Sequence, residues 1–105
     1  MATGRLGAND LAAATNTTVY EAGTGIYTVA SLNIVNRGSQ PTTINVAIAD
    51  LNTPDASEYI EFQTELLPKN VLERTGLVLA ATQKIVVSSS APNVSAVAFG
   101  IETTA

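Results

Sequence analysis

The strongest constraint on the fold is an alternation of apolar and polar residues with a period of two. It is clearest over residues 43–50. There Ile44, Val46 and Ile48 fall on one side of an extended chain, and small or neutral polar residues fall on the other. A β-strand sends successive side chains to opposite faces, so this pattern is typical of a strand with one buried face. No helical period is sustained over residues 17–102.

Similar segments recur along the chain between turn-forming residues. Gly38 can adopt the positive φ that closes a turn after a strand. Gly76 interrupts its segment and either bends that strand as a bulge or divides it in two. The segments predicted as strands are 17–20, 26–36, 43–50, 59–66, 71–79, 84–88 and 95–101. Seven such strands, or eight if Gly76 divides one, predict an all-β fold: an antiparallel β-sandwich, Ig-like or jelly-roll-like.

The first sixteen residues lack this patterning and contain Gly4, Gly7 and three alanines at 12–14. We therefore expect residues 1–16 to form a short N-terminal arm and residues 17–105 to form a single β-sandwich domain. Asp10 could cap one short helical turn within the arm. Two interpretations stay open: the arm is a frayed terminus, or it packs on a neighbouring subunit.

The residue types that are missing exclude several kinds of chemistry. The chain has no histidine, no cysteine and no tryptophan. Zinc–thiolate sites, cysteine nucleophiles, disulfide frameworks and serine mechanisms with a histidine base all need these residues. We expect no catalytic residue, no metal and no cofactor.

Charge narrows the class of partner. Charged residues make up only 13% of the chain, and five scattered basic residues face nine acidic ones for a net charge of −4. Nucleic-acid binders need clustered Lys and Arg, and a membrane span needs about 20 apolar residues in a row, so we expect neither partner. The N-terminus also lacks the apolar stretch of a signal peptide. A neutral polar surface is easily desolvated, which favours protein–protein assembly.

The acidic residues do not predict an active site. On a regular strand Glu61 and Glu65 share a face but lie about 13 Å apart, beyond the roughly 5 to 9.5 Å that glycoside hydrolysis requires. A hydrolase would need acids from distant strands, such as Glu73 and Glu102. The Asp50–Asp55 loop offers oxygens to a hard cation, but its spacing fits no EF-hand and its residue types are ordinary in turns.

Arg74 lies on the same side of its predicted strand as Leu72, the apolar side. A guanidinium there needs a partner, which the sequence offers as Glu73 of a neighbouring subunit, as Glu102, or across some other subunit contact. The alternative is an arginine near a sheet edge that reaches water.

Five segments resemble those of small virion structural proteins of tailed phages, notably phages of marine cyanobacteria. They are Met1–Ala8, Asn33–Gly38, Tyr59–Glu61, Val71–Leu79 and Val94–Glu102. The opening octet and the Leu-Glu-Arg-Thr-Gly run within 71–79 are the most specific. The resemblance implies a component of the particle rather than an enzyme, and it carries over no catalytic residue.

The resulting expectation is a capsid decoration or accessory protein that coats or stabilises the particle through symmetric contacts. It would reside in the virion after assembly in the host cytoplasm, with major capsid or tail proteins as partners. We expect a homotrimer about a local three-fold axis, which multiplies weak contacts. The candidate interface residues are Arg5, Leu6, Leu11 and Arg74.

The alternative function is a tail-associated or capsid-tip module that binds a receptor or glycan. It would use Tyr20, Tyr27 or Tyr59 as a stacking platform together with the Asp50–Asp55 loop. Tyrosines in a β-sandwich also serve as edge and interface packing, so these residues alone do not decide between the two functions.

Overall fold

The alternating segments become eight β-strands and one short 3₁₀ helix in the computed structural model, which describes residues 3–104. The strands are β1 (Thr3–Leu11), β2 (Thr17–Glu21), β3 (Ile26–Asn36), β4 (Thr42–Ala49), β5 (Tyr59–Leu66), β6 (Val71–Leu79), β7 (Lys84–Ser89) and β8 (Val94–Thr104), with η1 (Ala56–Glu58) before β5. All seven strands expected from the sequence are present, with ends shifted by at most three residues. Within residues 3–104, no helix has the length and apolar character needed to cross a membrane.

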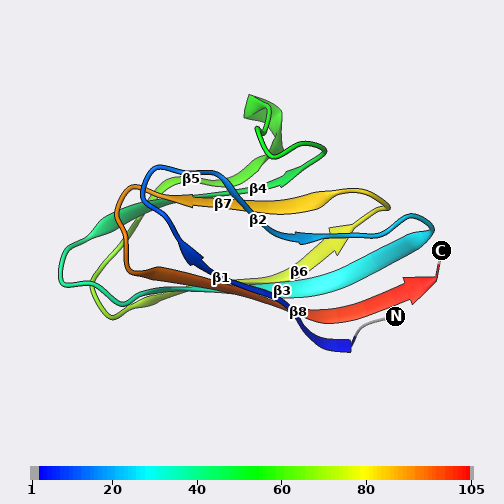
Figure 1. Ribbon diagram of the computed structural model, residues 1–105, viewed down its shortest axis with the longest axis horizontal. Coiled ribbons are helices and arrows are strands. Elements are labelled where there is room, and N and C mark those ends of the chain that lie inside the picture. Colours follow the sequence, from blue (N-terminus) through cyan, green and yellow to red (C-terminus); the bar gives the residue numbers. More distant parts are fainter. Residues whose placement is uncertain (1–2, 105) are drawn as a thin grey trace.

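The strands form two four-stranded antiparallel sheets that pack face to face (Figure 1). Sheet A has the order β1-β8-β3-β6, and sheet B has the order β2-β7-β4-β5. Strand pairs β1/β8, β2/β7, β3/β6 and β4/β5 are all antiparallel neighbours. A ribbon of four such pairs wound into two layers is a jelly roll. The β-sandwich is therefore confirmed, and of the two types considered it is the jelly roll.

The core between the sheets consists of the inward-facing residues of the alternating strands. Its largest fully buried apolar side chains are Leu32, Ile34, Ile44, Val46, Leu79, Ile85, Val87 and Val94. Each such side chain contributes about 1.5–3 kcal/mol when it leaves water. The positions expected to be apolar in β3 and β4 are the ones that fill this core.

The N-terminal segment differs from the expected arm. Residues 3–11 form β1, which pairs with β8 with one bulge between Arg5 and Gly7. A Cβ added to Gly7 would lie 2.0 Å from the carbonyl oxygen of Val19, so β1 passes directly against β2 and only glycine allows this approach. Residues 3–11 thus belong to the sandwich, and no helical turn follows Asp10. Met1 and Ala2 lie outside the described residues.

Two strands depart from regular alternation. In β6, Gly76 has a φ of 70° and lies in a bulge, so it bends the strand without dividing it, and β1 is the eighth strand. In β5, Gln63 has a φ of 51°, and the register against β4 shifts twice. Glu61 therefore lies opposite the buried Val46, whereas Glu65 lies opposite an exposed threonine. The expectation that the two glutamates share a face is wrong because of these bulges.

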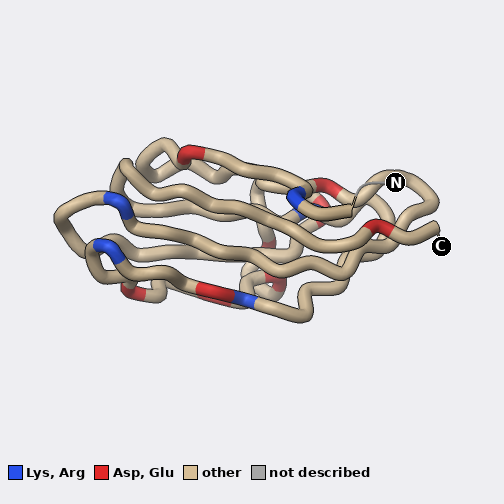
Figure 2. Tube along the Cα trace, turned by 90° about the horizontal axis from the view of Figure 1, so that it is seen from below, with Lys and Arg blue, Asp and Glu red and all other residues tan. Residues whose placement is uncertain are grey.

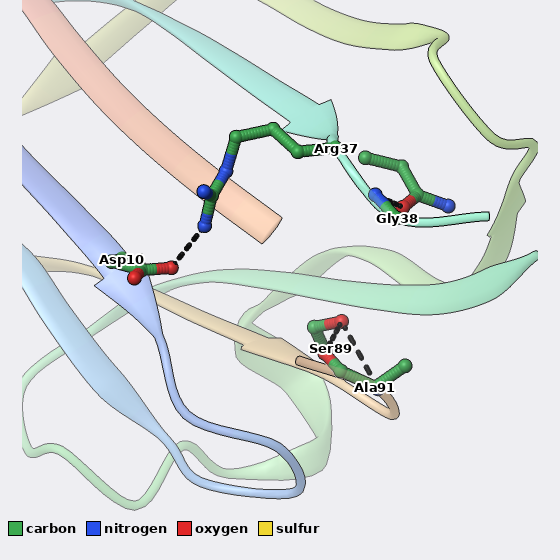
Figure 3. A network of polar contacts seen from close by, with 6 residues as sticks. Asp10, Arg37, Gly38, Ser89 and Ala91 are labelled. Carbon is green, nitrogen blue, oxygen red and sulfur yellow. Dashed lines mark hydrogen bonds and ion pairs between the residues drawn. The ribbon is translucent and has the colours of Figure 1, made fainter. Parts of the chain in front are cut away.

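Polar side chains close one end of the sandwich (Figure 3). The amide of the buried Asn36 donates to two backbone carbonyls at 2.8 and 3.1 Å and accepts from the backbone N–H of Gly38 at 2.9 Å. Arg37 pairs with Asp10 of β1, and Ser89 bonds to the backbone of Ala91. In the described part of the chain every buried side-chain nitrogen or oxygen has a hydrogen-bond partner, so these groups serve the fold.

Candidate functional site

One buried polar cluster joins the two sheets and is satisfied internally. The hydroxyl of Tyr20 in β2 donates to the carboxylate of Glu102 in β8 and lies 2.7 Å from Oγ1 of Thr28 in β3. Because a phenol has one proton, Thr28 donates in the second bond. Burial raises the pKa of Tyr20, and the hydrogen bond to Glu102 raises it further. Tyr20 is thus a protonated structural link at neutral pH and is not offered to a ligand.

The two glutamate pairs considered from the sequence, Glu61 with Glu65 and Glu73 with Glu102, each lie on different faces of their sheets. Glu102 lies opposite the inward-facing Thr28, and Glu73 lies opposite the outward-facing Asn33, so the two glutamates occupy opposite faces of sheet A. Glu61 accepts from Thr64 at 2.7 Å. Among residues 3–104, no group of three or more acidic side chains could hold a metal ion.

The Asp50–Asp55 loop is held against sheet B by its own polar groups. Oδ1 of Asn52 accepts from Thr18 at 2.6 Å, and its Nδ2 donates to the carbonyl of Asn16 at 3.2 Å. Nζ of Lys84 donates to the carbonyl of Asp50 at 2.8 Å. The amide oxygen of Asn52, which was considered as a cation ligand, therefore holds the loop in place through its hydrogen bond with Thr18.

The three tyrosines lie in separate places. Tyr20 is buried between the sheets, and Tyr27 lies on the outer face of sheet A. Tyr59 packs on the outer side of sheet B, where its ring meets that of Phe62 edge-on with centroids 5.2 Å apart. The structure does not bring them together into a stacking platform.

The four candidate interface residues also separate. Leu11 is buried in the core, so it is not available to a partner, and Leu6 is partly buried and packs against the core. Nη1 of Arg74 lies 2.9 Å from Oε2 of Glu61 and joins β6 to β5 across the two sheets. Its partner is thus neither Glu73 nor Glu102. Arg5 is exposed on the outer side of β1 and forms no ion pair with any residue of the described range.

The outer face of sheet A carries most of the exposed apolar side chains. Nine large apolar residues are exposed in the described chain, and six of them point outward from this sheet. We call these six the apolar face: Tyr27, Val29, Val71, Val78, Phe99 and Ile101, with exposures from 36% to 63%. Continuous exposed apolar patches of more than a few hundred Å² mark interaction sites in soluble proteins.

Strand register makes five of these side chains contiguous, whereas Val71 pairs with Val35, six residues along β3 from Val29. Val29 in β3 pairs with Val78 in β6 on one side and with Ile101 in β8 on the other, so three adjacent strands form one apolar row. Phe99 pairs with Ser31 and Arg5 in the next row. Cross-strand partners have Cβ atoms about 5 Å apart, so the side chains contact one another.

Charges lie only at the margins of this face. Figure 2 looks onto sheet A and shows charged positions mainly along its two edges. Within the middle strands β3 and β8 the one charged residue is Glu102, which lies opposite the inward-facing Thr28 and so points away from this face. Asp10 and Arg5 belong to β1, and Glu73 belongs to β6. Asp10 is already paired with Arg37, which leaves Arg5 and Glu73 at opposite margins without an ion pair among the described residues.

The sequence contains a signal for this face that strand prediction alone does not use. The run 96–101 in β8 is apolar at almost every position instead of alternating, and β3 has apolar residues at Tyr27, Val29 and Val35 on its outward side. Strands that are apolar on both sides are covered on both sides or present an interaction surface. Only the pairing of β3 with β8 shows that the two outward stripes lie side by side.

Comparison of the chain with protein-family models, with curated proteins and with solved structures found no match.

Proposed function

We propose that this protein is a non-enzymatic structural component of a phage particle, and that it coats or stabilises the capsid as a decoration or accessory protein. The observation that carries the proposal is the apolar face. A flat, contiguous and almost uncharged surface suits contact with another protein and holds no group that could activate a substrate.

The polar groups of the chain support the same conclusion. Glu61, Glu102, the buried tyrosine and the Asp50–Asp55 loop each have a structural partner, as described above. The jelly roll recurs in viral capsid proteins and in lectins, which is support by analogy of fold only. The resemblance of the five sequence segments to small virion proteins of tailed phages favours the particle over the lectin.

The proposed site of action is the virion, with capsid proteins as partners. Repeated copies on a symmetric lattice would multiply individually weak contacts through a high effective concentration. The alternative, a tail-associated or capsid-tip module that binds a receptor or glycan, has less support because Tyr20, Tyr27 and Tyr59 lie apart.

Co-sedimentation tests this proposal. The purified chain is mixed separately with emptied heads and with isolated tails of a tailed phage of marine cyanobacteria, and the pelleted protein is quantified. Saturable pelleting with heads is expected. Pelleting with tails alone would favour the tail-associated alternative, and pelleting with neither would contradict a role in the particle.

A further inference from the structure

We propose that the apolar face is a self-association surface, on which sheet A of a second copy of this chain packs about a two-fold axis. The inference rests on the proposed function only in taking protein–protein contact to be what the face is for. One patch that meets its own copy does so isologously, so the proposed species is a dimer instead of the trimer expected from the sequence.

The outer side of sheet A is large enough for a dimer interface. Strands β3 and β8 each have eleven residues, and β1 and β6 each have nine. Nine to eleven residues span about 30 to 36 Å, and four strands with their side chains span about 20 Å, which gives roughly 600 to 700 Å² per copy. A standard protein–protein interface buries about 800 Å² per partner. No described segment of the chain itself covers this area.

The pattern of the face is self-complementary about an axis parallel to the strands, between β3 and β8. Such an axis exchanges β3 with β8 and β1 with β6, because sheet A has the order β1-β8-β3-β6. Val29 pairs with Ile101 within one chain, so each of them would meet the other residue in the second copy. The apolar row of one copy thus covers the apolar row of the other.

The same rotation brings unlike charges together. Arg5 on β1 is opposite Phe99, and Glu73 on β6 is opposite Asn33, so they lie about two residues apart along the strands and at opposite margins. After the exchange of β1 with β6, Arg5 of each copy approaches Glu73 of the other within reach of its long side chain. An in-plane axis perpendicular to the strands would place the Arg5 margin of one copy on the same margin of the other, which like charges oppose.

Sedimentation equilibrium of the full chain over a wide concentration range tests the dimer. Replacing Val29→Lys and Ile101→Lys together puts unpaired ammonium groups into the contact and should raise the dissociation constant by about a hundredfold or more. Phe62→Lys, at a somewhat more exposed apolar position on β5, is the control and should leave association unchanged. A monomer at every concentration, a trimer, or a dimer insensitive to the double lysine variant would overturn the proposal.

Charge reversal tests the axis without touching the apolar side chains. Arg5→Glu alone and Glu73→Arg alone should each weaken the dimer by about five- to tenfold, because two attractive contacts become repulsive. The double variant should recover the wild-type dissociation constant, and so should a mixture of the two single variants. Failure of both rescues would exclude this arrangement. Because these measurements use purified protein, a dimer without head binding would contradict the particle role alone, and head binding by a monomer would contradict this inference alone.

Discussion

The two outer faces of the sandwich differ in what their side chains contact. On sheet B, Asn45 donates to Ser88 at 3.2 Å and accepts from the backbone of Gln63 at 2.6 Å, so the outward polar groups bind one another. On sheet A, the outward Val29 lies between Val78 and Ile101, and all three side chains are exposed to solvent. The outward polar side chains of sheet B thus have partners within the chain, whereas the outward apolar side chains of sheet A are left exposed to solvent.

Apolar residues on sheet B show the same contrast. Ala47, Ala49 and Val86 point outward, yet they are buried because Tyr59 packs over them. The segment between β4 and β5, with η1, lies above this end of sheet B in Figure 1. The chain covers these three residues of sheet B, although Phe62 of β5 stays exposed, and it leaves the outward apolar row of sheet A exposed. This difference, rather than hydrophobicity itself, marks sheet A as the interaction surface.

The largest loss of stability is expected at Gly100, where the backbones of β8 and β3 pack closely beneath the apolar face. A Cβ at Gly100 would lie 2.1 Å from the carbonyl oxygen of Val29 and 2.7 Å from Cα of Ala30. Gly100→Ala must therefore push β8 away from β3, and it should lower the free energy of unfolding by about 3 kcal/mol. Urea denaturation measures this change.

Gly23→Ala is the control for that experiment. An added Cβ there meets only a side-chain methyl of Ile26 at 3.4 Å. Its effect should stay within about 0.5 kcal/mol. Equal stability losses for the two variants would mean that the contact between β8 and β3 is not specially tight.

The next effect concerns the link beneath the apolar face. Tyr20→Phe removes the bonds to Thr28 and Glu102, whose chain neighbours Tyr27 and Ile101 belong to that face. Leaving a partly buried carboxylate and a buried hydroxyl without this partner should cost about 2 kcal/mol. Thermal and urea unfolding at neutral pH check the loss, and a variant as stable as wild type would show that water replaces the phenol.

The same substitution predicts a pH dependence. The pKa of Tyr20 is raised by burial and by its bond to Glu102, so folding favours the protonated phenol. That stabilisation is fully present below the unfolded value of about 10 and is lost as pH rises through the folded value. Wild type should therefore lose stability more steeply than Tyr20→Phe above pH about 10. Parallel curves for the two proteins would contradict the assignment.

A smaller loss of stability is expected on the outer face of sheet B. Asn45→Ala removes the acceptor for the N–H of Gln63, whose φ of 51° forms the β5 bulge, and should cost about 1 kcal/mol. Ser31→Ala is the matched change on the outer side of sheet A and should stay within about 0.5 kcal/mol. Chemical denaturation of both variants tests whether polar side chains stabilise sheet B alone.

The regular parts of the fold could be predicted from the sequence because local alternation and burial agree there. β3 and β4 are the clearest cases. β3 ends at Asn36, just before the expected turn, but the expectation that Gly38 takes a positive φ there is wrong. Gly76 was expected to mark either a bulge or a division, and the register shows the bulge. In these strands, the pattern of neighbouring residues in the sequence is enough to predict which side chains are buried.

The irregular parts depend on contacts between distant residues. β1 has weak patterning and becomes a strand because Gly7 can approach Val19 and Leu11 fills the core. The face of the sheet to which Glu61 points depends on the bulge at Gln63, which a hydrogen bond to Asn45 stabilises. The apolar face depends on which strands are neighbours, so Arg5 was the only candidate interface residue that the fold places beside it.

The smallest change in stability is expected for the substitutions that alter the apolar face most. Val29→Thr with Ile101→Thr keeps β-branched side chains that suit strands, at positions already 46% and 55% exposed, so stability should change by about 0.5 kcal/mol or less. Retention on a hydrophobic-interaction column should nevertheless fall. Val87→Thr, which buries a hydroxyl in the core, should instead cost about 1–3 kcal/mol and leave retention unchanged. A large loss of stability in the double variant would mean that Val29 and Ile101 stabilise the folded monomer. Sheet A would then, like sheet B, need no partner to cover its outer side chains.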